Sequence, residues 1–236
     1  MDRGKLYIIA TPIGNLEDIS ARALRILSEV DLIVCEDTRV TKKLLSHYAI
    51  ATPTESYHAQ SSRAKENKLL SLLRDRKHLA LVSDSGTPTI SDPGCRLISR
   101  AHEFPEEISL IAIPGPSAVI AALSLSGFSA SNFLFLGFLP HKKGRETLFN
   151  EIAQAKYTVV FYESPHRILK TLASLQDHLD DTRALVVARE LTKVYEEVKR
   201  GNAREILTYF SENPEKVRGE FVVVVGPTPS LENRSK

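Results

Sequence analysis

Two acidic residues stand in a loop of unusual composition and are the first candidates for chemistry in this sequence. Residues 83–94 read SDSGTPTISDPG, which places Asp84 and Asp92 among Gly, Pro, Ser and Thr. Glycines let a backbone approach a ligand closely and prolines fix the shape of a loop, so such a segment can present N–H and C=O groups to a small molecule. An ordinary connector can have the same composition. The loop by itself supports either interpretation.

Two further Gly/Pro segments raise the case for a ligand site: TPIGN at 11–15 and PGPSA at 114–118. Each of the three follows a short apolar run typical of a buried strand. In an open parallel sheet the ligand crevice lies outside the carboxyl ends of the strands, so the three loops are expected to line one site. None of them contains Lys or Arg, and no dinucleotide or triphosphate motif is present. An acidic, Gly-rich pocket suits a positively charged ligand, such as a sulfonium compound carrying adenosine and an amino-acid tail.

Strand and helix patterns alternate along the chain that must position these loops. In the first half, strands are expected at residues 5–10, 32–35, 79–83 and 108–113, with helices between them. The first helix has one apolar face, formed by Ile19, Ala23, Ile26, Leu27 and Val30. In the second half, strands are expected at 133–138, 157–163, 183–188 and 220–226, and helices at 144–156, 164–178 and 202–212. The alternation predicts βαβ units and an α/β fold with two α/β domains.

Composition bounds the class of protein. The chain has 236 residues, 42% apolar and 25% charged, which is typical of a soluble globular protein. We expect domains at 1–115 and 116–227 and a disordered polar tail at 228–236. Cys35 and Cys95 are interpreted as free thiols in a reducing cytoplasm, no metal-ligand spacing is present, and no apolar run has the length of a membrane span.

Local basic segments are the candidates for nucleic-acid contact, because the net charge is only +2. The segment PHKKGR contains Lys142, Lys143 and Arg145, and the segment FYESPHR contains His166 and Arg167. Such side chains can bind phosphates and position RNA without reading its bases. The alternative is a solvated loop end.

Eight segments together resemble a known family. They are TPIGNLEDIS, CEDTR, SDSGTPTISDPG, IPGPSA, GFLPHKKGR, FYESPHR, ARELTK and GEFVVVVGP. In order and spacing they resemble the ribosomal RNA small-subunit methyltransferase I family of the tetrapyrrole-methylase superfamily. The resemblance implies S-adenosylmethionine as cofactor and the ribose 2′-hydroxyl of a decoding-centre cytidine in 16S ribosomal RNA as methyl acceptor. It also implies a homodimer and two α/β domains, the first with a mainly parallel sheet and the second with a mixed one, with the cofactor in the cleft between them.

The resemblance also implies roles for individual residues. The cofactor contacts are expected to be Pro12, Ile13, Gly14, Asp84, Gly86, Thr87, Ser117, Ala118 and Ala188. The RNA contacts are expected to be Lys142, Lys143, Arg145, His166 and Arg167. The chemistry of a weakly acidic hydroxyl, rather than the resemblance, gives the candidates for the residue that assists proton removal: Glu163, Glu190 and Lys193, and also Glu36, Asp37 and Arg189.

Two other functions stay open from the sequence. A methyltransferase of the same superfamily could act on a tetrapyrrole or another small molecule, and the basic PHKKGR segment argues against this. A non-catalytic RNA-binding module is the second alternative, and the near-neutral net charge argues against it.

Overall fold

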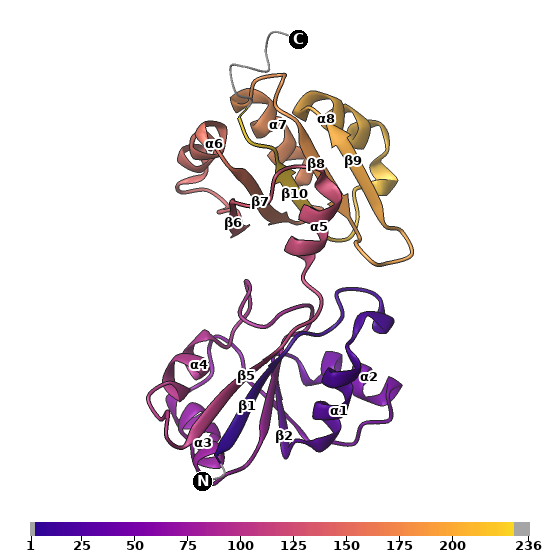
Figure 1. The fold of residues 1–236 in the computed structure, drawn as a ribbon. Helices are drawn as coiled ribbons and strands as arrows, with labels where there is room; N and C mark the ends of the chain where they lie inside the picture. The colour runs from indigo at the N-terminus through magenta and orange to yellow at the C-terminus, as the bar shows by residue number, and fades with distance from the viewer. Residues whose placement is uncertain (1–2, 229–236) are drawn as a thin grey trace. The chain divides into compact units, whose positions relative to one another are not determined.

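The structure is a computed structural model that describes residues 3–228 (Figure 1). It contains two compact units, Met1–Ser117 and Ala118–Lys236. The division falls two residues after the boundary expected at 115/116. Beyond Thr228, the tail that was expected to be disordered lies outside the described residues.

The first unit is built on a parallel five-stranded sheet with the order β3-β2-β4-β1-β5. Its strands are β1 (Gly4–Ile9), β2 (Leu32–Cys35), β3 (Thr54–Ser56), β4 (Leu79–Val82) and β5 (Ile108–Ile113). The four strands expected in this half are therefore present. The fifth strand, β3, was not predicted. It is a three-residue edge strand without an apolar run, so no hydrophobic pattern marks it in the sequence.

Helices cover both faces of this sheet (Figure 1). They are α1 (Ala21–Glu29), α2 (Thr38–His47), α3 (Arg63–Arg74) and α4 (Cys95–Ala101). The apolar side chains of α1 and α2 pack on one face, and those of α3 and α4 pack on the other. The predicted apolar face of the first helix is buried, and α1 begins after Ser20, whose Oγ accepts a hydrogen bond from the Ala23 N–H at 3.1 Å. With both faces covered, the open positions for a ligand are at the strand ends.

The second unit contains a mixed sheet, as expected, and its strand order is β6-β7-β10-β8-β9. Only β6 and β7 pair in parallel, and the other neighbours are antiparallel. The strands are β6 (Phe133–Phe138), β7 (Thr158–Glu163), β8 (Leu185–Arg189), β9 (Glu197–Gly201) and β10 (Phe221–Val225). The unpredicted strand β9 reads EVKRG and lies at the sheet edge, where charged residues are common.

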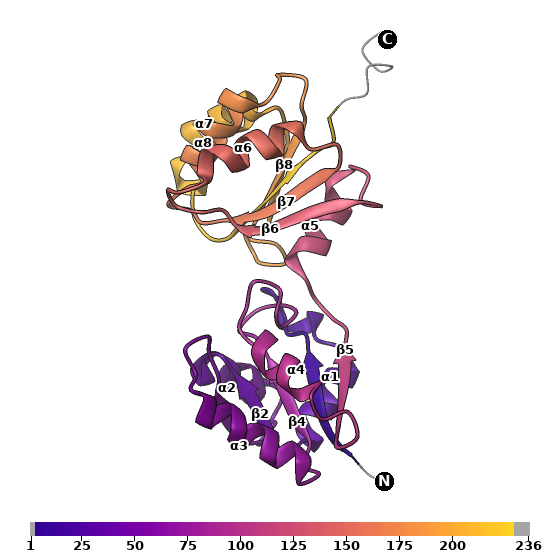
Figure 2. The ribbon, with the colours of Figure 1, turned by 90° about the vertical axis from the view of Figure 1, so that its left-hand side faces the viewer.

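Four helices complete the second unit: α5 (Ala118–Ser126), α6 (Arg145–Gln154), α7 (Ile168–His178) and α8 (Ala203–Glu212). The helices α6, α7 and α8 cover one face of the sheet, and α5 lies on the other (Figure 2). The core under α6 to α8 includes Phe149, Phe161, Phe210 and Phe221, each at most 1% exposed. This packing fixes the loops at the ends of β6 and β7. Between residues 3 and 228, no helix is long and apolar enough to cross a membrane.

Candidate active site

The three Gly/Pro loops of the first unit meet at the carboxyl ends of neighbouring strands. Thr11, after β1, and Gly86, after β4, form an antiparallel bridge with N···O distances of 2.9 and 3.1 Å. The Thr11 hydroxyl donates to the Ser83 carbonyl at 3.1 Å, and the Ser83 hydroxyl donates to the Gly86 carbonyl at 2.9 Å. Thr11 and Ser83 are buried, so these bonds hold the first two loops in one arrangement.

The third loop joins the same assembly. The Thr87 hydroxyl donates to the Pro116 carbonyl at 3.0 Å. Gly86 has a φ of +81°, and a Cβ at this position would lie 3.2 Å from Cγ2 of Ile13 and 3.6 Å from the Pro116 oxygen. The positive φ would strain any other residue, and a Cβ would press on the Ile13 side chain, so this position favours glycine. The structure thus brings Ile13, Gly86 and Thr87 together.

Acidic side chains gather beside these loops. Burial, followed by the charges of Glu36 and Asp84, raises the pKa of Asp92 to about 6. Burial and the charge of Asp84 also raise the pKa of Glu36. Asp84 is half-buried, and its Oδ1 accepts a hydrogen bond from the Asp37 N–H at 3.0 Å. Three carboxyl groups gathered in this way create a negative potential at this edge of the sheet, which suits a cationic ligand.

Asp37 differs from its neighbours because its carboxylate faces an arginine. The side chain and N–H of Arg39 hydrogen-bond to it and lower its pKa to about 2. The bond from the Arg39 N–H is also the bond by which Asp37 caps the N-terminus of α2. The two acids of the CEDTR segment therefore have different roles. Asp37 caps α2, and Glu36 belongs to the group of acids beside the loops.

The other expected cofactor contacts are distributed over both units. Pro12 is half-buried and Gly14 is exposed, in the loop that also holds Ile13. Ser117 ends the first unit, and Ala118 begins the second. Ala188 is completely buried in β8, which is paired on both sides by β10 and β9. Within the described residues, no group of three or more His, Cys, Asp or Glu is arranged to hold a metal ion.

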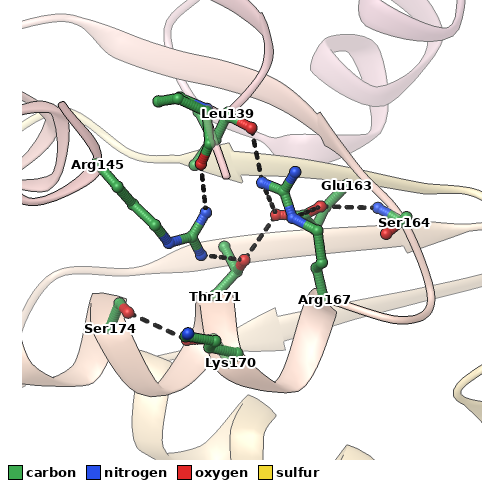
Figure 3. A network of polar contacts seen from close by, with 9 residues as sticks. Leu139, Arg145, Glu163, Ser164, Arg167, Lys170, Thr171 and Ser174 are labelled. Atoms are coloured by element: carbon green, nitrogen blue, oxygen red, sulfur yellow. Dashed lines mark hydrogen bonds and ion pairs between the residues drawn. The ribbon is translucent and has the colours of Figure 1, made fainter. Parts of the chain in front are cut away.

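Glu163, a candidate base, is instead the centre of a buried network in the second unit (Figure 3). Its side chain is 1% exposed. Oε1 accepts from the Ser164 N–H at 2.9 Å, and Oε2 accepts from the Thr171 hydroxyl at 2.6 Å. Arg167 pairs with the same carboxylate at 3.2 Å. Both oxygens are therefore engaged inside the protein, which is the arrangement of a structural carboxylate.

Glu190 and Lys193 form an ion pair after β8. Nζ of Lys193 lies 2.9 Å from Oε1 of Glu190 and 2.8 Å from Oε2 of Glu220. Burial alone would raise the pKa of Glu190, but the bonds from Lys193 and the Glu220 N–H outweigh it and lower that pKa. Burial likewise opposes ionisation of Lys193, yet the two carboxylates raise its pKa. Both groups are therefore held in their charged forms, so Lys193 is a fixed cation.

The backbone at this ion pair is strained. Glu190 has a φ of +50° and Thr192 a φ of +66°. Thr192 is the rarer case, because a β-branched residue in the left-handed region is an outlier. Two non-glycine residues in this region within three positions mark a segment whose conformation is imposed by its surroundings. Strain of this kind is common at functional sites.

The five expected RNA contacts separate into two groups. Lys142, Lys143 and His166 are exposed. Arg145 is 7% exposed, and its guanidinium bonds to the Thr171 hydroxyl at 2.7 Å and lies over the Phe149 ring at 4.9 Å. Arg167 is half-buried against Glu163. Arg145 is thus placed inside the unit, away from the surface position that a phosphate contact needs, whereas Arg167 keeps 17% of its side chain exposed.

Sequence reasoning missed several members of these networks. Asp92 was noted only as part of its loop, and Ser83, Thr11 and Thr171 were not expected to have a role. A signal existed for Arg145: it precedes the buried Phe149 by four residues, so the two lie on one helix face. No sequence pattern distinguishes Thr171 from other helical threonines.

The comparisons with known proteins match nearly the whole chain. The family model of tetrapyrrole (corrin/porphyrin) methylases matches residues 5–207. The chain is 48% identical to ribosomal RNA small subunit methyltransferase I of Synechocystis sp., with 96% of this chain and 80% of that protein covered. It is 44% identical to the protein of the same name from Thermotoga maritima, with 94% of this chain and 98% of that protein covered.

Solved structures share the fold at much lower identity. The methyltransferase CobJ superposes with a TM-score of 0.68 and 19% identity, with 95% of each chain covered. Uroporphyrin-III-C-methyltransferase from Thermus thermophilus superposes with a TM-score of 0.63 and 18% identity, with 95% of this chain and 94% of that chain covered. These structural similarities confirm the expected fold class. The sequence matches at 44% and 48% identity show which group of the family the chain is similar to in sequence. The chain belongs to the tetrapyrrole methylase family and, within it, to the group of ribosomal RNA small subunit methyltransferase I.

Proposed function

We propose that this protein transfers a methyl group from S-adenosylmethionine to 16S ribosomal RNA in the small ribosomal subunit. Within that RNA, we propose the ribose 2′-hydroxyl of a decoding-centre cytidine as acceptor. The observation that carries the proposal is the 48% identity over 96% of the chain with a protein of that name. We also infer that it acts in the cytoplasm, because ribosomal subunits are the proposed substrate.

The negative charge of the acidic residues in the first unit is complementary to the positive charge of the cofactor. S-adenosylmethionine supplies an electrophilic methyl group on a positively charged sulfonium. The carboxyl groups of Glu36, Asp84 and Asp92 give the loop edge a negative potential, seen in the raised pKa values of Glu36 and Asp92. We propose that Asp84 and Asp92 offset the cationic charge, while Pro12, Ile13, Gly14, Gly86, Thr87 and Ser117 shape the pocket. Ala118 and Ala188 stay proposed contacts from the second unit.

The protein's contribution to the reaction is chiefly positional. Methyl transfer is an in-line displacement, and holding the attacking oxygen at near-attack distance can supply about 7–11 kcal/mol of the barrier. As the ribose oxygen attacks the methyl group, its hydroxyl proton must leave, and we propose that it passes to solvent water. Lys193, fixed as a cation by Glu190 and Glu220, lowers the pKa of that hydroxyl and so favours the loss of the proton. Glu190 orients Lys193. Glu163 has a different role, which is developed in the next section.

We propose that Lys142, Lys143 and His166 contact RNA phosphates. They are exposed, and they lie in the loops that follow β6 and β7. Phosphate contacts of this kind position a substrate without reading its sequence. They explain how a chain with a net charge of +2 can bind RNA.

We also propose a homodimer, as the family resemblance implies. The second unit exposes large apolar side chains on α5 and β6: Ile120, Leu125, Phe133, Leu134 and Phe138, with exposed fractions between 39% and 60%. Apolar side chains exposed on a sheet edge and the nearby helix are typical of an interface. Light scattering of the purified protein should give twice the mass of one chain, and a single-chain mass would refute the dimer.

A methylation assay tests the reaction against its alternatives. Purified protein is incubated with methyl-labelled S-adenosylmethionine and either small ribosomal subunits or tetrapyrrole precursors. We expect label only in the 16S RNA of the subunit. Label only in the tetrapyrrole would identify a small-molecule methyltransferase. Binding to subunits without label in either acceptor would identify a non-catalytic RNA-binding module.

A further inference from the structure

The buried network around Glu163 contains two of the arginines expected to bind RNA (Figure 3). We propose that Arg145, Glu163, Arg167 and Thr171, called here the arginine frame, position the basic loop of residues 141–144 for RNA without touching RNA. This inference rests on the proposed function, because the loop that the four residues hold carries Lys142 and Lys143, the proposed RNA contacts. The four members are positioning residues.

The two guanidinium groups hold consecutive carbonyls immediately before the basic loop. Nη2 of Arg167 donates to the Leu139 carbonyl at 2.6 Å, and Nη1 of Arg145 donates to the Pro140 carbonyl at 3.2 Å. At the other end of the loop, the Arg145 N–H donates to the Lys142 carbonyl at 3.3 Å as α6 begins. The frame therefore fixes the backbone on both sides of the exposed lysines.

Thr171 and Glu163 connect the two arginines. The Thr171 hydroxyl accepts from Nη2 of Arg145 at 2.7 Å and donates to Oε2 of Glu163 at 2.6 Å. Glu163 in turn pairs with Arg167 and accepts from the Ser164 N–H. Ser164 begins the turn that carries the exposed His166, since its carbonyl accepts from the Arg167 N–H at 3.0 Å. One network thus joins the basic loop after β6 to the turn after β7.

Burial separates the frame from the RNA-contacting surface. Thr171 is 0% exposed, Glu163 is 1% exposed and Arg145 is 7% exposed. The exposed lysines belong to the loop itself. These three side chains are too enclosed to contact RNA, so they can act on it only through the backbone that they hold. Arg167 keeps 17% of its side chain exposed, but its guanidinium is engaged by Glu163 and by the Leu139 carbonyl.

The charge of the frame favours a role in RNA binding over simple stabilisation. It contains two guanidinium groups and one carboxylate, so it carries one net positive charge next to the basic loop. Burial and the charge of Arg167 lower the pKa of Arg145, so this cation is held at a cost in stability. A positive charge beneath a phosphate-binding loop adds to its attraction for RNA.

Thr171→Val tests the frame, because it removes one buried hydroxyl, keeps the shape and changes no charge. We expect the KM for small ribosomal subunits to rise about tenfold, because binding must then order loop backbone that the frame had ordered. We expect kcat to stay within about twofold and cofactor affinity to be unchanged, because the loss is in substrate binding only. Thr171→Ser, which restores the hydroxyl, should restore the KM.

Ser174→Ala is the matched control. Ser174 lies on the same helix, and its hydroxyl bonds only to the Lys170 carbonyl of its own helix at 3.1 Å (Figure 3). The KM of Ser174→Ala for small ribosomal subunits should equal that of the wild type. An unchanged KM in folded Thr171→Val, or a fall in kcat with KM unchanged, would overturn the positioning role. If the wild type does not methylate subunits, the proposed function itself fails, which is a separate result.

Arginine modification of the wild-type protein provides a second test that needs no variant. Phenylglyoxal is applied to the protein with and without small subunits, and modified positions are mapped by mass spectrometry. We expect Arg145 to be unreactive in both states. An Arg145 that reacts in the free protein and is shielded by subunits would be a direct RNA contact and would overturn the proposal.

Discussion

The acidic residues near the Gly/Pro loops show that side chains of one chemical type acquire different properties from their surroundings. Asp37 faces Arg39, which lowers its pKa to about 2. Burial and two neighbouring carboxylates raise the pKa of Asp92 to about 6. The Asp37 carboxylate already has the Arg39 guanidinium as its partner, whereas Asp92 has two acidic neighbours, so a cation that arrives beside Asp92 relieves the repulsion among them.

The first prediction concerns pH. Below about pH 6 Asp92 is protonated and no longer attracts a cation, so the affinity for S-adenosylmethionine should fall as the pH drops through 6. Isothermal titration calorimetry between pH 5 and 8 measures this affinity. Asp92→Asn should bind at all these pH values as the wild type does near pH 5. An affinity independent of pH in the wild type would remove Asp92 from the site.

The raised pKa of Asp92 affects stability in the opposite direction: rising pH favours cofactor binding but lowers the free energy of unfolding. A carboxyl group whose pKa is raised in the folded state binds more protons folded than unfolded, so the free energy of unfolding decreases as pH rises through the interval up to about 6. Asp92→Asn should therefore stabilise the protein at pH 7 by roughly 1 kcal/mol, after allowance for partial exposure. Thermal unfolding at pH 4 should show no such gain.

The second prediction is that Asp84→Ala weakens S-adenosylmethionine binding while the protein stays folded. Asp84 is half-buried among acids and bonds only to the Asp37 N–H in the contacts described. A hydrogen bond involving a charged group contributes about 1.5–3 kcal/mol, so calorimetry should show a roughly 10- to 100-fold loss of affinity. Asp75→Ala, an exposed acid between α3 and β4, is the control. Equal affinities for both variants would refute the role.

At the scale of elements, the loops are organised by the strands that they follow. Parallel pairing of β1 with β4 and β5 brings three separate segments to one edge, and the Thr11–Gly86 bridge then joins two of them. A glycine at position 86 serves the contact between loops as much as the approach of a ligand. The prediction below separates these two effects.

Gly86→Ala should reduce both stability and cofactor affinity. Gly86 has a φ of +81°, and a Cβ would lie 3.2 Å from the Ile13 side chain. Left-handed backbone costs a non-glycine residue about 1–2 kcal/mol, and the crowding displaces the first loop as well. Gly144→Ala is the matched control, since its φ is +79° but a Cβ would meet nothing within 4 Å. Denaturant unfolding should show a loss in both variants, and calorimetry a loss of affinity only in Gly86→Ala.

The elements that could be predicted from the sequence are those with a strong apolar period. Strands such as β6, predicted at 133–138, were found at Phe133–Phe138. The missed strands β3 and β9 are edge strands that bury little apolar surface, so tertiary pairing alone defines them. For the site, composition located the three loops. The four-residue spacing of Arg145 and Phe149 places both on one helix face, but whether that face is buried depends on the packing of α6 against α7.

At the scale of the whole molecule, charge must be concentrated to bind RNA. The net charge is +2, and other surface lysines, such as Lys68 and Lys77, are paired with Glu55 and Asp31 and so add no net charge. Lys142 and Lys143 are exposed beside a frame with a net positive charge. The phosphate contacts of this unit are therefore expected to depend on those two lysines.

Changing both Lys142 and Lys143 to Ala should weaken binding to small subunits and make its salt dependence shallower, because fewer counterions are released. The KM should rise while kcat stays within about twofold, since phosphate contacts contribute equally to the ground and transition states. Filter binding at several salt concentrations measures the slope. Lys65 and Lys68, which lie on α3 of the other unit, provide a control pair when changed to Ala. An unchanged salt dependence of subunit binding in the variant of Lys142 and Lys143 would show that the loop is solvated and does not contact RNA.

The most direct test of the central claim is mass mapping of ribose methylation in 16S ribosomal RNA from cells with and without this protein. We predict that one decoding-centre cytidine carries a 2′-O-methyl group in the parent cells and lacks it in cells without the protein. Expression of the wild-type chain should restore that group, and expression of Asp84→Ala should not. Identical methylation in cells with and without the protein would contradict the account.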